Sequence, residues 1–275
     1  SASDERYAKA AAYPTTFYGQ LGALKRNGTS ALRLPDAPDI DSTTAASFND
    51  EEPTQALKLC LEYGAKNLAG RLISGLIEDG TPEEAALVAK LVGDGDSQYL
   101  AVRAAKKAMQ KNIVLVDVGY PRISTPGGIA IERPLALAVA RQESEFDKRA
   151  TSPSGAMGLI QLMPRTAKET AKKADMKFDK NRLYEPDYNL LIGTKYLSRM
   201  IDNYDGSYVM AIAAYNAGPG NVEVPKGRPG QFQRRCGIAD HHLPDEFRRA
   251  VRVRRSGGGV LGERIVIHRL AVHRG

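Results

Sequence analysis

Signals that start and stop helices recur through most of the chain, and they constrain its fold more than any other feature. Thr81 at a cap position, Pro82 at the first helical position and Glu84 three residues after the cap form a capping box. Small and apolar residues then repeat at helical spacing up to Val92. Strand signals are nearly absent over residues 1–221, so we predict an all-α fold.

The part before residue 113 is predicted to be a succession of short helices. The segment Leu34–Pro53, rich in Pro, Asp, Ala and Thr, is expected to be a long connection with room for a short turn of helix. Short helices joined by brief glycine-bearing turns are typical of a helical solenoid, but no fixed repeat period is present. An ordinary helical bundle fits the pattern equally well. The predicted helices cover Phe17–Arg26, capped by Thr16, and Thr54–Tyr63, Ala65–Ile77, Pro82–Leu91 and Asp96–Lys111.

A domain boundary is expected at residues 112/113. Ile113–Val116 has the composition of a short strand, but Asp117 interrupts the apolar run and an irregular link follows to about Ile129. Helices are predicted again beyond this link. They cover Pro134–Ser144, Pro164–Asp175, Pro186–Ile201 and a last segment from Ser207 that ends at Gly218.

Glu143 is the first candidate for chemistry. Leu135, Val139 and Glu143 are spaced i, i+4, i+8 and share one helix stripe, so the carboxyl group of Glu143 points toward apolar surroundings. Desolvation and the negative end of the helix dipole both oppose its ionisation. A carboxyl group that stays protonated near neutral pH suits general-acid cleavage of a glycosidic bond. Glu145 is predicted to project to the other side. The alternative for Glu143 is an exposed residue at a frayed helix end.

Two further groups accompany Glu143. Gly155 and small neighbours allow close backbone approach, while Gln161 and Met163 offer amide and apolar contacts that suit a sugar. The alternative is ordinary packing of a turn. Asn216 continues the stripe of Val209, Ile212 and Ala213, so it is expected on a core face beside Tyr215. It is either a ligand contact or a structural pin at the helix end.

Three motifs in this order resemble the catalytic domain of the soluble lytic transglycosylases. They are Glu143-Ser144 with Phe146, the run Ser152–Pro164 and the run Ala214–Gly220. The resemblance covers about Ile113 to Val222, and Tyr13–Gln20 resembles the end of the helical superhelix that precedes this domain in large periplasmic members. It implies a superhelix-like segment over 1–112, a lysozyme-like α-rich catalytic domain over 113–221 and a divergent tail over 222–275.

The same resemblance implies the activity and the partners. Glu143 would be the sole catalytic acid and base, cleaving the β-1,4 bond between N-acetylmuramic acid and N-acetylglucosamine with formation of 1,6-anhydro ends. Ser152, Gln161, Met163 and Tyr215 match substrate-groove positions, and Asn216 lies beside them. The expected partners are peptidoglycan glycan strands in the periplasm, with no cofactor, no metal and no nucleic acid. The alternatives are a muramidase that leaves reducing ends, and a binding module with impaired turnover.

The tail departs from the family pattern after Val222. Residues 1–221 are neutral, and the tail carries the whole net charge of +7 and all four histidines. Lysine nearly vanishes there while arginine persists, which indicates a shifted reading frame or an inserted segment. A metal site at His241, His242, Asp245 and Glu246 lacks tetrahedral spacing, and the arginines lack the interleaved aromatic residues of a nucleic-acid binder. A solvated or disordered segment is the preferred interpretation.

The composition also argues against several other classes of protein. No window reaches the roughly 18 uninterrupted apolar residues of a membrane span. Cys60 and Cys236 are too few for a disulfide framework and lack CxxC spacing. The first residues lack the pattern of a secretory signal, which does not exclude export of a longer protein.

Overall fold

The structure, a computed structural model, describes residues 2–28, 34–93 and 97–222. Over these residues the prediction of an all-α fold is confirmed, since they contain no β-strand and only isolated bridge positions, such as the antiparallel pair Thr151 and Met157. The chain forms two compact units. Unit 1 comprises the described residues up to Ser124 together with Val139–Gln161, and unit 2 comprises Thr125–Ala138 with the described residues from Leu162 on.

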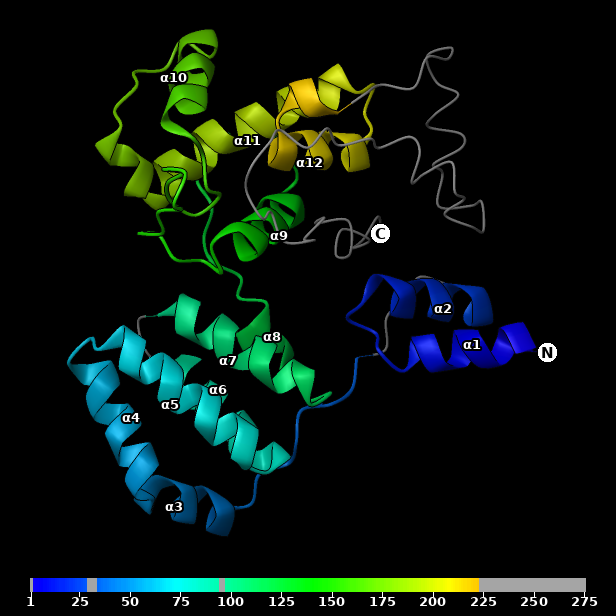
Figure 1. Ribbon diagram of the computed structural model, residues 1–275, viewed down its shortest axis with the longest axis vertical. Helices are drawn as coiled ribbons and strands as arrows, with labels where there is room; N and C mark the ends of the chain where they lie inside the picture. Colours follow the sequence, from blue (N-terminus) through cyan, green and yellow to red (C-terminus); the bar gives the residue numbers. More distant parts are fainter. Residues whose placement is uncertain (1, 29–33, 94–96, 223–275) are drawn as a thin grey trace. The chain divides into compact units, whose positions relative to one another are not determined.

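Helices make up both units, as Figure 1 shows. In unit 1 they are α1 (Ala2–Ala11), α2 (Phe17–Asn27), α3 (Ser42–Asp50), α4 (Glu52–Glu62), α5 (Lys66–Asp79), α6 (Pro82–Gly93), α7 (Gln98–Gln110) and α8 (Val116–Gly119). Helix α9 (Arg133–Glu143) begins in unit 2 and ends in unit 1. Unit 2 continues with α10 (Pro164–Lys173), the 3-10 helix η1 (Asn181–Tyr184), α11 (Pro186–Asn203), α12 (Tyr208–Ala217) and the 3-10 helix η2 (Pro219–Asn221).

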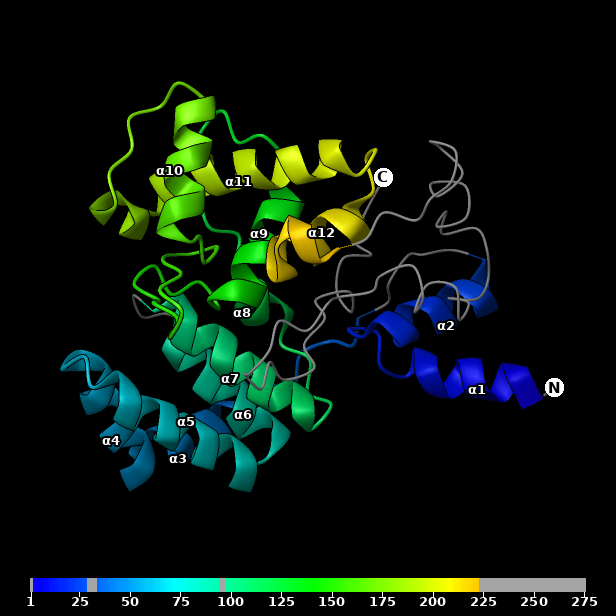
Figure 2. The same cartoon turned by 45° about the horizontal axis from the view of Figure 1, so that its top comes forward.

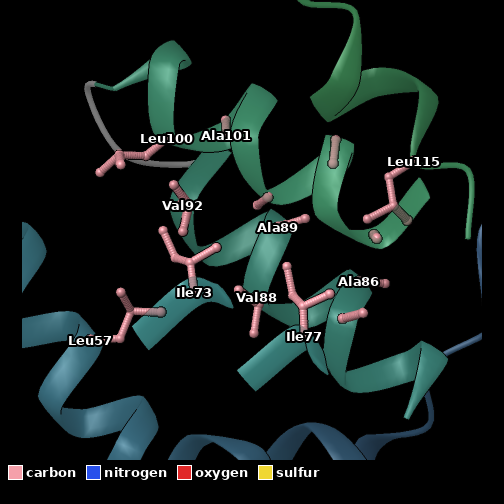
Figure 3. Close-up of a cluster of buried hydrophobic side chains, with 14 of the residues drawn as sticks. Leu57, Ile73, Ile77, Ala86, Val88, Ala89, Val92, Leu100, Ala101 and Leu115 are labelled. Carbon is pink, nitrogen blue, oxygen red and sulfur yellow. The ribbon is translucent and has the colours of Figure 1, made fainter. Parts of the chain in front are cut away.

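The core of unit 1 lies between α4, α5, α6 and α7 (Figure 3). Leu57, Ile73, Ile77 and Val88 are fully or almost fully buried there, and alanines on α6 and α7 let these helices approach closely. The predicted capping box starts α6: the Glu84 carboxylate accepts from the backbone N–H of Thr81 at 2.7 Å, and the Thr81 hydroxyl accepts from the N–H of Glu84 at 3.2 Å.

The start of the chain forms a hairpin of α1 and α2, which lie side by side in Figures 1 and 2. The predicted cap of α2 is confirmed, because the Thr16 hydroxyl accepts from the N–H of Gly19 at 3.0 Å. Helix α1 was not among the predicted helices. Gly22 lets the two helices meet, since a Cβ there would lie 2.7 Å from the carbonyl oxygen of Tyr7.

Two local predictions were incomplete. The expected long connection over Leu34–Pro53 contains α3, a helix of nine residues rather than a short turn. Asp41 caps it by accepting from two backbone N–H groups at 2.8 Å, and Phe48 anchors it in the core. The strand-like run Ile113–Val116 pairs with no strand among the described residues. Ile113, Val114 and Leu115 are buried, and the half-buried Val116 begins α8.

In unit 2, α11 and α12 pack side by side (Figures 1 and 2). Helix α11 begins at Pro186, as predicted, and α12 begins after Ser207, whose hydroxyl accepts from the N–H of Met210 at 3.4 Å. It ends at Gly218, which has a φ of 87°. The predicted domain boundaries at residues 112/113 and 221/222 stay predictions. The candidate metal ligands and the expected disorder of the tail concern residues 223–275, which lie outside the described residues.

Candidate active site

Glu143 is the last residue of α9. Leu135 and Val139, on the same stripe, are 6% and 5% exposed, so the stripe faces apolar surroundings as predicted. Burial of the half-buried carboxyl group raises the pKa of Glu143 from 4.5 to about 7. The predicted rise in pKa is therefore confirmed, and near neutral pH a large share of the molecules carry a protonated Glu143.

Ser144 fixes the backbone directly after Glu143. Its buried hydroxyl lies 2.6 Å from the carbonyl oxygen of Leu159, to which it donates, and 3.2 Å from that of Ala140. The first contact joins the end of α9 to the segment that carries Gln161. Because the groups are buried, this hydrogen bond is costly to lose.

Glu145 and Phe146 turn the chain away from α9. Both have positive φ, 54° and 66°, a conformation that costs about 1–2 kcal/mol for each non-glycine residue. Phe146 is buried, and the Glu145 carboxylate lies 2.5 Å from the Nζ of Lys106. This ion pair agrees with the prediction that Glu145 does not share the position of Glu143.

Ser152 begins a tight turn in the same unit. Its backbone N–H donates to the carbonyl of Ala156 at 2.9 Å, and its hydroxyl oxygen accepts from the N–H of Ala156 at 3.0 Å. Gly155 closes the turn with a φ of 85°, where a side chain is strained. The hydroxyl oxygen of Ser152 thus accepts from the backbone, and its proton is the part that can be donated to a ligand.

Gln161 follows a similar pattern. Its side-chain N–H₂ donates to the carbonyls of Gly158 at 2.8 Å and Ala150 at 3.2 Å, while its own backbone has a φ of 48°. Both amide hydrogens are therefore used within the turn. The interpretation as loop packing holds for the N–H₂ group, and ligand recognition is left to the side-chain carbonyl oxygen.

Residues 128–235 match the family described as "Transglycosylase SLT domain". The match contains Glu143 and the Ser152 turn, and it continues past Val222 to Arg235, into the segment that was expected to depart from the family. The chain carries a transglycosylase SLT domain.

The SLT domain and the segment before it also match longer proteins. The chain is 42% identical over 214 residues to a soluble lytic murein transglycosylase of Salmonella typhimurium, and 40% identical over 215 residues to one of Escherichia coli K12. Each alignment covers 76% of this chain and 33% of the relative. The chain therefore spans about a third of the length of these relatives.

Solved structures of lytic transglycosylases are also similar to this chain. An inactive mutant of the lytic transglycosylase Slt from Pseudomonas aeruginosa aligns with a TM-score of 0.66 at 29% identity, covering 78% of this chain and 36% of that one. The 70 kDa soluble lytic transglycosylase of Escherichia coli aligns with a TM-score of 0.63 at 25% identity, covering 80% and 36%. The all-α, lysozyme-like fold class expected from the sequence is thus confirmed.

The remaining predicted site residues of the SLT domain lie in unit 2. Met163, 41% exposed, is the residue before Pro164 at the start of α10. Tyr215 is half-buried on α12, with its ring centroid 5.4 Å from that of Tyr196 at an angle of 51°. The structure thus gathers Glu143, Ser152 and Gln161 in one unit, and it places Met163, Tyr215 and Asn216 in the other.

The expectation for Asn216 was wrong in one respect. The side chain was predicted on a face that belongs to the core, but it is exposed. All five residues from Met210 to Ala214 are buried, so α12 has no single apolar stripe that could be extended to Asn216. Because the Asn216 amide is exposed, it does not need a protein or ligand partner to offset a cost of burial. The contact of Asn216 with a ligand therefore stays a prediction, without the support that burial would have given.

Sequence reasoning missed two charged residues near Glu143. Arg141 is buried, its Nε donates to the carbonyl of Gly119 at 2.6 Å, and its guanidinium lies 4.2 Å from the ring centroid of Tyr120. Lys106 pairs with Glu145. Lys106 and Glu145 are 39 residues apart in the sequence, so no local sequence pattern could predict that they pair.

In the described part of the chain, no three His, Cys, Asp or Glu side chains are grouped so that they could hold a metal ion. The candidate ligands of the tail lie outside it. Over residues 2–28, 34–93 and 97–222, no helix has both the length and the apolar character needed to cross a membrane.

Proposed function

We propose that this chain belongs to a lytic transglycosylase that cleaves the β-1,4 bond between N-acetylmuramic acid and N-acetylglucosamine in peptidoglycan and forms 1,6-anhydromuramic ends. The observation that carries the proposal is the carboxyl group of Glu143, whose pKa of about 7 suits a general acid at neutral pH. The relatives named as soluble lytic murein transglycosylases support the substrate and the reaction.

The reaction needs one carboxyl group in two successive roles. Protonated Glu143 donates its proton to the oxygen that links the two sugars, and the bond from that oxygen to the anomeric carbon of the muramic residue breaks. The muramic C6 hydroxyl oxygen then forms a bond to the same carbon. Its proton goes to the Glu143 carboxylate, which restores the acid. No water is consumed, and the leaving sugar departs with a free hydroxyl group.

This cycle explains why a single acid suffices. Most glycosidases place a second carboxylate near the scissile bond, either to activate water or to act as nucleophile. In the proposed reaction the nucleophile belongs to the substrate. The desolvated surroundings of Glu143 favour the protonated form that starts the cycle and also strengthen its interaction with the developing charge on the sugar.

Five other residues are proposed to bind the glycan strand. The Ser152 hydroxyl proton and the Gln161 carbonyl oxygen supply hydrogen bonds, since their other polar groups are used within the turn. Met163 offers an exposed apolar surface, Tyr215 an aromatic face, and Asn216 an exposed amide. The similarity to soluble lytic murein transglycosylases also supports a periplasmic location for this chain. It further supports the expected division into a superhelix-like segment, a catalytic domain and a tail.

The test is digestion of purified sacculi by the chain, with mass spectrometry of the released products. Anhydromuramic ends support the proposal. Reducing ends alone would assign a muramidase instead. The Glu143→Gln variant should release products at least about 1,000 times more slowly, because an amide N–H is far too weak an acid to protonate the glycosidic oxygen. The Pseudomonas aeruginosa relative, described as inactive after replacement of one glutamate by glutamine, supports this expectation.

Glu169→Gln is the matched control, since Glu169 is an exposed carboxylate that pairs with Arg165 on α10. It should leave turnover unchanged. Equal and negligible release by the unmodified chain and by Glu143→Gln, with binding to sacculi retained, would instead support a binding module.

A further inference from the structure

Helix α7 contacts the chain on the far side of Glu143 through an ion pair. The Nζ of Lys106 lies 2.5 Å from the Oε1 of Glu145, and both side chains are 25% exposed. Glu145 is the second residue after Glu143, and its positive φ is a conformation that non-glycine residues leave unless other contacts hold them. A partly buried charge pair supplies such a contact because solvent screens it incompletely.

The preceding side of Glu143 is held as well. Arg141, two residues before Glu143, is buried and donates from Nε to the carbonyl of Gly119 at 2.6 Å. Gly119 ends α8 and lies directly on α7, since a Cβ at this glycine would stand 3.0 Å from the Cβ of Ala105. Ala105 and Lys106 are neighbours on α7, so a single helical turn supports both contacts.

We propose that α7 positions the catalytic acid: Lys106 holds Glu145, and Gly119, packed on α7, holds Arg141, so that Glu143 is fixed from both sides along the chain. Lys106 and Arg141 are positioning residues that act through the backbone rather than on the substrate. This inference rests on the proposed role of Glu143 as the acid.

The proposal assigns a task to the segment before the SLT domain. Lys106, Gly119 and Tyr120 all precede residue 128, where the family match begins, whereas Arg141 and Glu145 lie within it. The helical segment thus supplies half of each contact. A catalytic group must stay within about 0.5 Å of its productive geometry, so this support bears directly on turnover.

The experiment compares Lys106→Met with Lys107→Met in the whole chain. Lys107 is the next residue of α7, is 27% exposed and pairs with Glu78, so its substitution removes the same charge without touching the Glu143 segment. Lys106→Met should lower kcat on glycan strands by on the order of 10-fold with KM within about twofold, below the roughly 100-fold loss that a 1 Å misplacement causes. Lys107→Met should leave both constants unchanged.

Exchange of the two charges separates positioning from a general loss of stability. The double variant Lys106→Glu with Glu145→Lys restores the pair in reverse, and it should recover most of the kcat that either single variant loses. A kcat for Lys106→Met equal to that of Lys107→Met, or no recovery in a folded double variant, would overturn the proposal.

A second measurement does not depend on turnover. Titration of the Glu143 carboxyl carbon by NMR, assigned by comparison with Glu143→Gln, should give a midpoint near 7 in the unmodified chain. In Lys106→Met the midpoint should fall toward 4.5 as the carboxyl group gains water, while Lys107→Met keeps it. An unchanged midpoint in Lys106→Met would contradict the positioning role. Activity that survives Glu143→Gln would contradict the proposed function instead.

Discussion

The hydroxyl of Ser144 donates a 2.6 Å hydrogen bond to the carbonyl oxygen of Leu159, a residue 15 positions further along the chain. Both residues are buried, so the contact joins the end of α9 to the segment that carries Gln161 without competition from water. It is the direct connection between the backbone next to the candidate acid and the turn that presents two candidate sugar contacts.

Ser144→Ala should therefore destabilise the chain by about 1–3 kcal/mol, because the carbonyl of Leu159 loses its buried donor. Thermal unfolding of the purified variants measures this. Ser74→Ala is the control: the Ser74 hydroxyl only donates back to the carbonyl of Gly70 in its own helix at 2.9 Å, so its loss should change stability by less than about 0.5 kcal/mol. Equal melting temperatures for the two variants would show that the Ser144 contact contributes nothing.

The pKa of Glu143 predicts how stability depends on pH. The folded chain holds a proton on Glu143 up to about pH 7, whereas the unfolded chain releases it near pH 4.5, so stability falls as pH rises between these values. The full difference corresponds to about 3 kcal/mol. Glu143→Gln removes this dependence.

The melting temperatures of the two chains should accordingly be similar near pH 4, and Glu143→Gln should melt at a higher temperature at pH 8. Differential scanning calorimetry across this range measures the difference. A constant gap between the two chains from pH 4 to pH 8 would mean that Glu143 titrates alike in the folded and unfolded states.

The same ionisation predicts the pH dependence of turnover. The proposed reaction starts from protonated Glu143, so kcat/KM should decrease about tenfold for each unit of pH above 7. Release of anhydromuropeptides at a series of pH values, at constant ionic strength, gives the profile. A profile that stays flat to pH 9 would exclude a carboxylic acid with this pKa as the proton donor.

Gly155 should be sensitive for a backbone reason alone. Its φ is 85°, and an added Cβ would meet no atom within 4 Å, so Gly155→Ala should cost about 1–2 kcal/mol through conformational strain without a clash. Gly155→Asn should cost less, since asparagine tolerates a positive φ. Gly127→Ala is the control, because Gly127 has equally open surroundings and no positive φ. Urea unfolding that ranks alanine and asparagine equally at position 155 would refute the strain argument.

Local sequence patterns predicted those parts of the molecule that depend on neighbours within one or two turns. The capping box of α6, the cap of α2 and the start of α12 formed as predicted, since each uses a side-chain contact over three residues. Helix α11 also begins at Pro186 as predicted, because proline suits the first position of a helix. The same reasoning failed for α3, where the turn-like composition concealed the Asp41 cap and the buried Phe48.

For the candidate site, the sequence by itself predicted the candidate acid, Glu143, and its raised pKa. The spacing of Leu135, Val139 and Glu143 along one helix was enough to predict a desolvated carboxyl group with a raised pKa. The tertiary structure alone decided what surrounds that acid: the Lys106 pairing with Glu145, the contact of Arg141 with Gly119, and the exposure of Asn216. These depend on which segments pack together across tens of residues, and helical periodicity within one segment carries no information about that choice.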